Sequence, residues 1–489
     1  MNEFEAVIGL EAHAQLKTAS KMFCPCPQAD PGAEPNSHIC PVCTGQPGTL
    51  PSLNKKAVEL GIKAGIALNC RVNEISVFAR KNYFYPDLPK AYQISQFDRP
   101  LCAEGGVEID LKPSGTRTIR VARAHLEEDA GKSLHALGSR ALDHTLLDFN
   151  RCGVPLIEIV SEPDIRSADE AHACLAELKK LLQWADISEC DMEKGELRCD
   201  VNISMSHAGT KEPGSKVEIK NLNSFKAVKD AINHETERQT ALLKRGGTVE
   251  RDTRLWNEKE RKTVSMRSKE LAHDYRYFPE PDLPPLCITA AQLEAAKAEA
   301  GEPPRARKAR FARDFALNGR DAETLTSNRH LSGYFEACMK AAAAEKAEAK
   351  TVANLITGEF FARANELKIT PENYLLKAIS PLNLVKLAAL SDAGRVSATA
   401  AKAVFAASWE TGKDPAILLV ELGLERVDNA ARIEAWAREA IAANPGAAED
   451  FKNGNDRALG PIVGMIISKS GGKANPRLAG EIIKKLLLQ

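Results

Sequence analysis

Apolar and polar residues alternate along the segment from Val7 to Leu16. Successive side chains of a β-strand point to opposite faces, so this pattern predicts a strand with one apolar and one polar face. The apolar face consists of Ile8, Leu10, Ala12, Ala14 and Leu16, and the polar face of Glu11, His13 and Gln15. By itself the pattern also fits an edge strand with a solvated face.

The same alternation returns in three later segments, residues 156–160, 198–204 and 216–220. Glu158 lies within an apolar run, and burying a carboxylate there is costly unless it is paired or bound to a metal. The polar positions of the other two segments are Arg198, Asp200, Asn202 and Ser204, then Lys216, Glu218 and Lys220. We therefore expect a sheet with one acidic side that binds a divalent cation and, through it, nucleotide phosphates. Its residues are Glu11, His13, Glu158, Asp200 and Glu218.

A short strand is predicted over residues 119–124, and His125 follows it, close to three consecutive acids, Glu127, Glu128 and Asp129. Adjacent carboxylates repel one another unless water or a cation screens them. Two interpretations stay open at this point. The segment is either an exposed acidic turn or part of a cation site.

Helical periodicity predicts helices over residues 55–68, 168–185 and 226–244. Ser167 and Glu170 form a capping-box pattern at the start of the second helix. Gly61 and Gly65 weaken the prediction of the first helix, because glycine has a low helix propensity. After residue 290 the alternation gives way to alanine-rich helical sequence. We predict three domains, residues 1–292, 293–405 and 406–489.

The chain has 489 residues with 66 basic and 66 acidic side chains, so net charge does not announce a nucleic-acid partner. The segment 452–489 is an exception, with seven Lys or Arg against two Asp or Glu. It contains a Gly471-Gly472 turn flanked by Lys469 and Lys473. This pattern fits contact with an RNA backbone, although an ordinary helix cap would look similar.

The sequence contains no apolar run of the roughly 18 residues that a membrane span needs. The first residues are acidic and lead directly into the predicted strand, which is unlike a signal peptide. We expect a cytoplasmic protein without membrane association. Its cysteines are then expected to be reduced.

Four of the twelve cysteines form two close pairs, Cys24 with Cys26 and Cys40 with Cys43. Two such pairs joined by a short loop can place four thiolates around one tetrahedral metal ion. The loop between them has too few apolar residues to fold unaided, so the metal would replace a core. We predict a structural zinc site with four cysteine ligands. His38 is the competing ligand.

The segment 80–97 combines three tyrosines and three basic residues with interrupting prolines. Aromatic and cationic side chains together suit a nucleotide base or the end of a nucleic acid. The alternative is a packed surface loop. The proline-rich segment 274–285 is predicted to close the first domain, and Arg276 or Glu280 is a candidate contributor to the same cleft.

Eight segments resemble the family of B subunits of bacterial tRNA-dependent amidotransferases. They are VIGLEAH (7–13), RKNYFYPD (80–87), AYQISQFD (91–98), LEEDAGK (126–132), PLIEIVSEPD (155–164), LRCDVNIS (197–204), EIKNLNSF (218–225) and DYRYFPEPD (274–282). The resemblance is strongest over about the first 290 residues. It implies an α+β cradle domain related in fold to glutamine synthetase, with an antiparallel sheet. A helical domain and a small helical tail that grips tRNA would follow.

The resemblance also implies a function. Such an enzyme uses ATP to phosphorylate the side-chain carboxylate of misacylated Asp-tRNA(Asn) or Glu-tRNA(Gln), and ammonia then displaces the phosphate. The ammonia comes from a glutaminase A subunit through an internal channel, and a small C subunit completes a heterotrimer. This division agrees with the absence of a convincing nucleophilic serine or cysteine in the chain. The rival interpretations are a free-standing glutamine-synthetase-like ligase and a non-catalytic RNA-binding zinc scaffold.

Carried over by position, the family's magnesium site falls on five residues of this chain: Glu11, His13, Glu128, Glu158 and Glu218. The resemblance thereby selects Glu128 over Glu127, which alternation alone could not do. Asp200 is a candidate for a second metal ion or a water-mediated contact. The residues assigned to ATP binding are Lys90, Tyr92, Arg198, Asp200 and Asn202.

Overall fold

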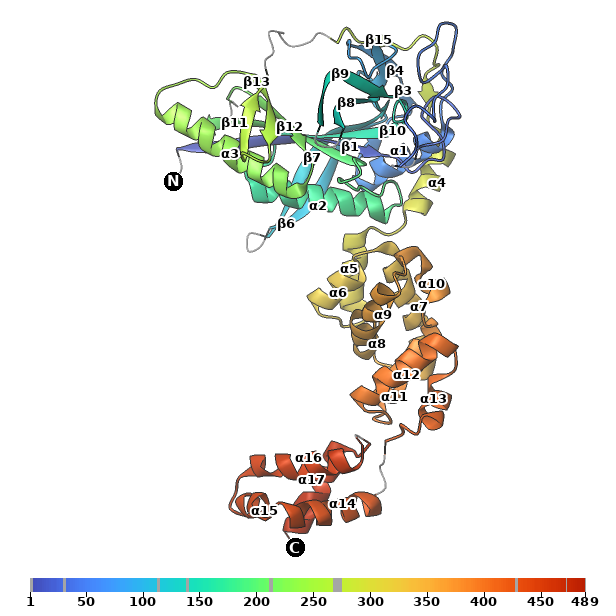
Figure 1. Ribbon diagram of the computed structural model, residues 1–489, viewed down its shortest axis with the longest axis vertical. Coiled ribbons are helices and arrows are strands. Elements are labelled where there is room, and N and C mark those ends of the chain that lie inside the picture. Colours follow the sequence, from blue (N-terminus) through green and yellow to red (C-terminus); the bar gives the residue numbers. More distant parts are fainter. Residues whose placement is uncertain are drawn as a thin grey trace. The chain divides into compact units, whose positions relative to one another are not determined.

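The protein is described by a computed structural model that covers residues 3–29, 32–111, 115–137, 140–210, 214–266, 275–426, 430–471 and 473–488. Asp274 and Gly472, which belong to two of the segments discussed above, lie outside these ranges. The chain divides into two compact units, Met1–Pro303 and Pro304–Gln489 (Figure 1).

One large mixed sheet dominates the described part of the first unit (Figure 1). Its strands, in spatial order, are β14 (Lys262–Ser265), β13 (Asp252–Asn257), β12 (Val217–Leu222), β11 (Leu197–His207), β1 (Phe4–Gln15), β10 (Pro155–Ser161), β7 (Gly115–Glu128), β6 (Cys102–Leu111) and β2 (Arg71–Val72). Neighbours run antiparallel, except that β12 and β13 are parallel. The helix α3 (Phe225–Lys244) connects these two strands, and such a crossover returns the chain in the same direction. The mixed α and β composition is confirmed, and the predicted antiparallel sheet is wrong at this pair.

Three smaller sheets contain the other strands among the described residues of this unit. They are β15 (Phe278–Pro279) with β4 (Phe78–Asn82) and β5 (Tyr92–Gln96), β16 (Leu286–Cys287) with β3 (Ile75–Ser76), and β8 (Lys132–Leu137) with β9 (Arg140–Asp148). The predicted loop 80–97 therefore contains two paired strands, β4 and β5. Its prolines lie in the connection between them, where no ladder hydrogen bond is lost.

The alternation in β1 is confirmed, because every even-numbered residue from Phe4 to Ala14 is buried and every odd-numbered one except Gly9 is partly exposed. The strand lies between β11 and β10, so it is not an edge strand. The prediction for β7 was too short, since this strand continues through Glu128. Glu127, Glu128 and Asp129 are each at most 3% exposed, which overturns the exposed acidic turn.

The three predicted helices are confirmed as α1 (Lys55–Ala67), α2 (Ala168–Trp184) and α3. The Ser167 hydroxyl accepts from the backbone N–H of Glu170, but the Glu170 carboxylate accepts from Arg166 rather than closing the capping box. The glycines of α1 reflect close packing. A Cβ at Gly65 would lie 2.3 Å from the Cys102 sulfur of β6.

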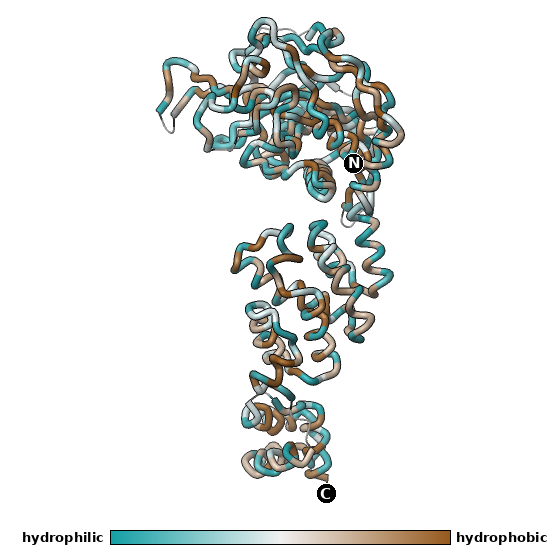
Figure 2. The backbone as a smooth tube through the Cα atoms, turned by 90° about the vertical axis from the view of Figure 1, so that its right-hand side faces the viewer, coloured by the Kyte–Doolittle hydropathy of each residue, from teal (hydrophilic) through white to brown (hydrophobic). Residues whose placement is uncertain are grey.

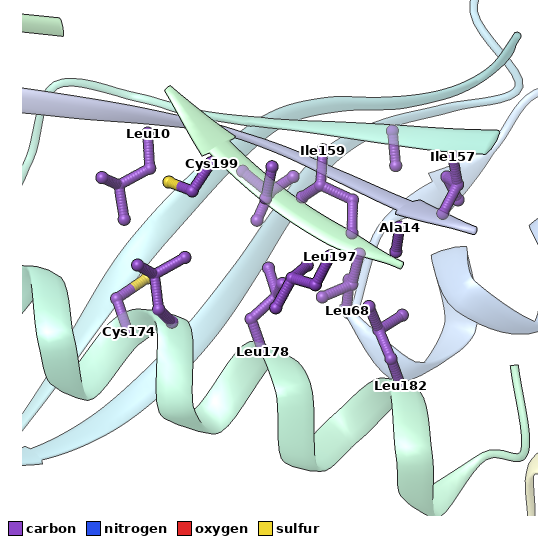
Figure 3. Packing of buried hydrophobic residues seen from close by; sticks show 14 of the residues in the cluster. Leu10, Ala14, Leu68, Ile157, Ile159, Cys174, Leu178, Leu182, Leu197 and Cys199 are labelled. Atoms are coloured by element: carbon purple, nitrogen blue, oxygen red, sulfur yellow. The ribbon is translucent and has the colours of Figure 1, made fainter. Parts of the chain in front are cut away.

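The core of this unit lies between the apolar face of the sheet and the helices α1, α2 and α3. Figure 3 shows side chains of β1, β10 and β11 directed at one face of α2. The residues of α2 labelled there are Cys174, Leu178 and Leu182, and Ala168, Ala171 and Leu175 belong to the same core. One face of the sheet is thereby sealed, which leaves the opposite, polar face for chemistry. A fourth helix, α4 (Ala290–Ala300), also packs into this core through Ala296.

The second unit is helical in its described residues and contains two cores. The first core is built by α5 (Pro304–Asp314), α6 (Gly319–Leu325), α7 (Arg329–Glu345), α8 (Ala349–Leu355), a π-helical turn (Ile356–Phe360), α9 (Phe361–Glu366), α10 (Tyr374–Lys377), α11 (Pro381–Asp392), α12 (Ala398–Thr411) and α13 (Pro415–Glu421), with a 3-10 turn (Pro371–Asn373) before α10. The second is built by α14 (Ala430–Ala443), α15 (Pro445–Lys452), α16 (Leu459–Lys469) and α17 (Pro476–Leu487), with a 3-10 turn (Asp456–Ala458) before α16. Hydrophobic and hydrophilic residues intermingle along these helices (Figure 2), as expected where each helix buries one face.

The cores suggest domain limits that differ slightly from those predicted. The predicted boundary at residues 405 and 406 falls inside α12, and Leu419 of α13 still belongs to the first helical core. We therefore propose that the first domain extends through α4 and that the third begins near residue 430. Among the described residues, no helix is both long and apolar enough to cross a membrane.

Candidate active site

Strand register brings the predicted polar residues together on one face of the large sheet. Glu11 of β1 lies opposite Asp200 of β11, and His13 lies opposite Glu158 of β10. Glu158 in turn lies opposite His125 of β7. Directly opposed residues share a face of a sheet, so four neighbouring strands contribute to one polar surface.

The first acidic cluster on this surface consists of His13, Glu127 and Glu158. The Nε2 atom of His13 lies 3.2 Å from a Glu158 carboxylate oxygen and 3.5 Å from one of Glu127. The Ser95 hydroxyl donates to the other Glu127 oxygen at 3.1 Å. One donor atom from each of the three residues falls within 4.8 Å of the others, so together they can hold a metal ion.

Opposite charges govern protonation in this cluster. Burial alone would raise the pKa of Glu158, but the charge of His125 and the hydrogen bond from His13 lower it well below its usual range. Burial would lower the pKa of His13, but the hydrogen bond to Glu158 and the charge of Glu127 raise it. Glu158 is therefore ionised at neutral pH, which is the form that binds a divalent cation.

The second cluster consists of Glu11, Asp200 and Glu218, whose oxygens also approach within 4.8 Å of one another. Lys220 lies 2.8 Å from Asp200 and 3.0 Å from Glu218, and it offsets part of their charge. Asn202 donates from Nδ2 to Glu11 at 2.8 Å. Its Oδ1 atom is buried without a hydrogen-bond partner, so an oxygen acceptor is left at the edge of the cluster.

Glu128 belongs to neither cluster. Its carboxylate forms an ion pair with Lys90 and accepts from the backbone N–H of Ile94 at 3.0 Å. It lines a cavity of about 220 Å³ that is shared with Tyr92, Arg80 and the cysteine loop. Because Glu127 precedes it in the strand, the two side chains point to opposite faces. The predicted set of five thus divides into His13 with Glu158, Glu11 with Glu218, and Glu128 alone.

The residues assigned to ATP divide in the same way. Asp200 and Asn202 lie at the second cluster, and Arg198 donates to Asp129 at 2.7 Å. Lys90 and Tyr92 instead line the cavity, where Lys90 pairs with Glu128. Glu280, the other candidate for this cleft, forms an ion pair with Arg80, which donates to both of its carboxylate oxygens at 2.8 and 2.9 Å.

Sequence reasoning left three residues of the first cluster's surroundings unassigned: Glu127, His125 and Lys81. Continuing the alternation of β7 from the buried Ile119 and Val121 would have placed His125 and Glu127 on the apolar face. The pairing with β10 shifts register between Val160 and Ser161, and after this shift Ala124 and Leu126 are the residues that face the core. No local pattern indicates Lys81 either, because its distance from the two carboxylates of the cluster depends on how β4 packs. Burial lowers the pKa of Lys81, but the charges of Glu127 and Glu158 raise it overall, and its ammonium lies 4.9 Å from the Tyr275 ring.

The four predicted cysteines meet in a separate cluster. One sulfur from each of Cys24, Cys26, Cys40 and Cys43 lies within 4.8 Å of the others, which fits a tetrahedral thiolate site. His38 is not part of this group, and its ring lies 2.9 Å from the Ser37 hydroxyl. Hydrogen bonds from Cys24 and from the Cys40 backbone, with the nearby charge of Lys21, outweigh burial and lower the pKa of the Cys43 thiol to about 4.

Fold and site together define an α+β enzyme domain with two acidic clusters able to hold metal ions, followed by a helical region. The model of the GatB/GatE catalytic domain matches residues 6–294, and that of the GatB domain matches residues 334–487. The chain belongs to the GatB/GatE family.

Curated relatives align along the full length of the chain. The protein of Elusimicrobium minutum is 50% identical over 489 residues, which is all of both chains. Those of Carboxydothermus hydrogenoformans and Caldicellulosiruptor saccharolyticus are each 47% identical, and the alignments cover at least 99% of every chain. All three relatives are named as B subunits of aspartyl/glutamyl-tRNA(Asn/Gln) amidotransferases.

Proposed function

We propose that this chain is the catalytic B subunit of a tRNA-dependent amidotransferase, an ATP-dependent carbon–nitrogen ligase with glutamine as the amide donor. Family membership and the full-length relatives support the activity. The observation that carries the catalytic assignment is the pair of acidic clusters on one face of the sheet. A scaffold that only binds RNA has no need to gather six ligand side chains from five strands at one surface.

Both clusters have the chemistry of a magnesium site, because five of their six side chains are carboxylates and Mg2+ prefers oxygen ligands. We assign His13, Glu127 and Glu158 to one ion and Glu11, Asp200 and Glu218 to another. Bound there, such ions would neutralise the phosphates of a nucleotide during phosphoryl transfer.

The chain's own residues then have distinct tasks. A carboxylate is a poor electrophile, so phosphorylation of the Asp or Glu side chain on the tRNA must precede attack by ammonia. Lys220 and Arg198 supply positive charge beside the phosphates. Asn202 holds Glu11 in place through its amide N–H and presents its free carbonyl oxygen to the bound nucleotide or metal. These roles position reactants and offset charge, which accounts for most of the catalysis in phosphoryl transfer.

The partners are proposed from the family resemblance and from the charge of the C-terminal segment. We propose that a glutaminase A subunit delivers the ammonia and that a small C subunit completes the assembly, as the family resemblance implies. The first unit would form a cradle related to glutamine synthetase, with its sealed face on α2 and α3 and its polar face toward the substrate. The basic residues of the segment 452–489 would contact the tRNA backbone.

Amidation by the reconstituted three-subunit complex tests this function. We expect Asp-tRNA(Asn) or Glu-tRNA(Gln) to be amidated only when ATP, Mg2+ and glutamine are all present. Measuring both misacylated tRNAs also defines the substrate. A chain that amidates a free acid and forms no tRNA complex at low salt would instead be a free-standing ligase.

The cysteine cluster is proposed to hold a structural zinc ion. Four protein ligands leave no open coordination position, so this ion would take no part in the reaction. We expect about one zinc ion per purified chain by elemental analysis and a loss of most of it in Cys26→Ser, because three thiolates bind zinc far less tightly than four. The control is Cys287→Ser, which removes an exposed cysteine outside the cluster. Equal zinc content in both variants would refute the assignment.

A further inference from the structure

Lys21 is one of the largest fully buried side chains of the described chain, with no exposed surface. It follows β1 and lies beside the cysteine cluster. Its Nζ atom donates to the carbonyl of His38 at 2.7 Å and to that of Phe149 at 3.4 Å, and it lies 3.6 Å from the sulfur of Cys43. An ammonium group has three N–H donors, so these three contacts use all of them.

The contacts of Lys21 lack the partner that a buried ammonium normally has. A buried charge is costly unless an opposite charge is near it. Two of the three acceptors are neutral carbonyls, and within the described ranges no carboxylate forms an ion pair with Lys21. The group beside it that can carry negative charge is the thiolate of Cys43.

The cysteine cluster would carry an excess of negative charge that complements the Lys21 ammonium. Four thiolates around one divalent ion carry a net charge of about −2, and this charge is itself buried in part. Gly153 lies against both residues, since a Cβ there would be in ordinary van der Waals contact with Cys43 at 3.4 Å and with the Lys21 stem at 3.5 Å. The positive charge of the ammonium and the negative charge of the thiolate centre therefore compensate each other.

We infer that Lys21 is the counter-cation of the metal–thiolate centre, where it donates to Cys43 and stabilises the bound state of the metal. This inference rests on the zinc site proposed above. Lys21 is a positioning residue for that metal and takes no part in amidation. The same ammonium ties the loop between the cysteines to residue 149, directly after β9. Metal retention and the seating of this loop thus depend on one side chain.

The test compares zinc release from the full-length chain into excess EDTA for the wild type and two variants, Lys21→Met and Lys21→Gln. Removing a partner of a metal ligand commonly costs about 10- to 100-fold in metal affinity. We expect both variants to release zinc at least about tenfold faster than the wild type. Gln retains an N–H donor for the carbonyls but has no charge, so it separates charge compensation from the mechanical tie and serves if Met prevents folding.

The matched control is Lys63→Met. Lys63 is also buried, but it lies in α1 and faces Glu299, so its loss should leave the release rate at the wild-type value. Cobalt substitution provides a second readout. Without the nearby positive charge the thiolates donate electrons more readily, so the sulfur-to-cobalt charge-transfer band should move to longer wavelength in both Lys21 variants.

The outcomes separate the two proposals. Wild-type protein that contains no zinc contradicts the metal site itself. Wild-type protein that retains zinc, with unchanged release rate and cobalt band in the Lys21 variants, leaves the metal site standing and overturns the role of Lys21. Faster release with an unshifted band also overturns it, because Lys21 would then be only a mechanical tie.

Discussion

Glu158→Gln is expected to abolish ATP-dependent amidation by the reconstituted complex while tRNA binding stays intact. Glu158 is 7% exposed and lies within 3.6 Å of both His13 and His125. Glutamine keeps the volume but removes the charge that would hold the metal ion. Stabilisation by a metal ion is worth several kcal/mol, and each 1.4 kcal/mol changes the rate about tenfold, so we expect a loss of about a thousandfold.

The measurement combines a rate of amide formation with a tRNA-binding isotherm for the same preparation. Glu108→Gln is the matched control, since Glu108 is an exposed glutamate on β6 of the same sheet. Its amidation rate should equal that of the wild type. If Glu158→Gln amidates within about twofold of the wild type, the carboxylate has no catalytic role and the non-catalytic scaffold becomes the better interpretation.

Substitutions of the neighbouring glutamates Glu127 and Glu128 on β7 are expected to affect different properties, the amidation rate and the stability of the fold. Glu127→Gln removes a ligand of the first acidic cluster, so amidation should fall by about a hundredfold and recover in part at high Mg2+. Glu128→Gln leaves the Lys90 ammonium buried without its partner. Breaking a buried ion pair in this way costs about 3–5 kcal/mol, so the free energy of unfolding should fall while the Mg2+ requirement stays unchanged.

A magnesium titration of the amidation rate and a urea denaturation curve for each variant distinguish these effects, and each variant serves as the control for the other. The two residues differ by one position and are equally buried. A raised Mg2+ requirement in Glu128→Gln alone would restore the assignment made from family resemblance and contradict the one made from geometry.

Local pattern predicted much of the sheet. The alternation of β1, the isolated carboxylate of residue 158 and the polar positions of β11 and β12 all lie on the expected face. These predictions succeeded because the side-chain direction in a strand depends only on counting residues along it. The spacing of the cysteines worked for a similar reason, since short loops restrict which sulfurs can meet.

The end of β7 shows what counting residues along a strand cannot predict. Three adjacent acids look like a solvated turn, because burying them seems too costly. In the folded protein each is offset by a different partner: Glu127 by His125, Glu128 by Lys90 and Asp129 by Arg198. Lys90 and Arg198 are 38 and 69 residues distant along the chain from their acids. Their placement follows from strand pairing, which no local pattern encodes.

The sequence by itself determined which side chains of β1, β10, β11 and β12 share the polar face of the sheet, that four cysteines can share a metal and which family the chain resembles. Only the tertiary structure decided that the acidic residues form two clusters, that Glu127 rather than Glu128 joins the first, and that Lys21 lies against the thiolates. The physical reason is that alternation and spacing are properties of single segments, whereas the partner of a buried charge is chosen by strand register and packing. The strand from Val7 to Leu16 illustrates both cases. Its apolar and polar faces could be predicted from the sequence, but the two acidic clusters to which Glu11 and His13 belong could not.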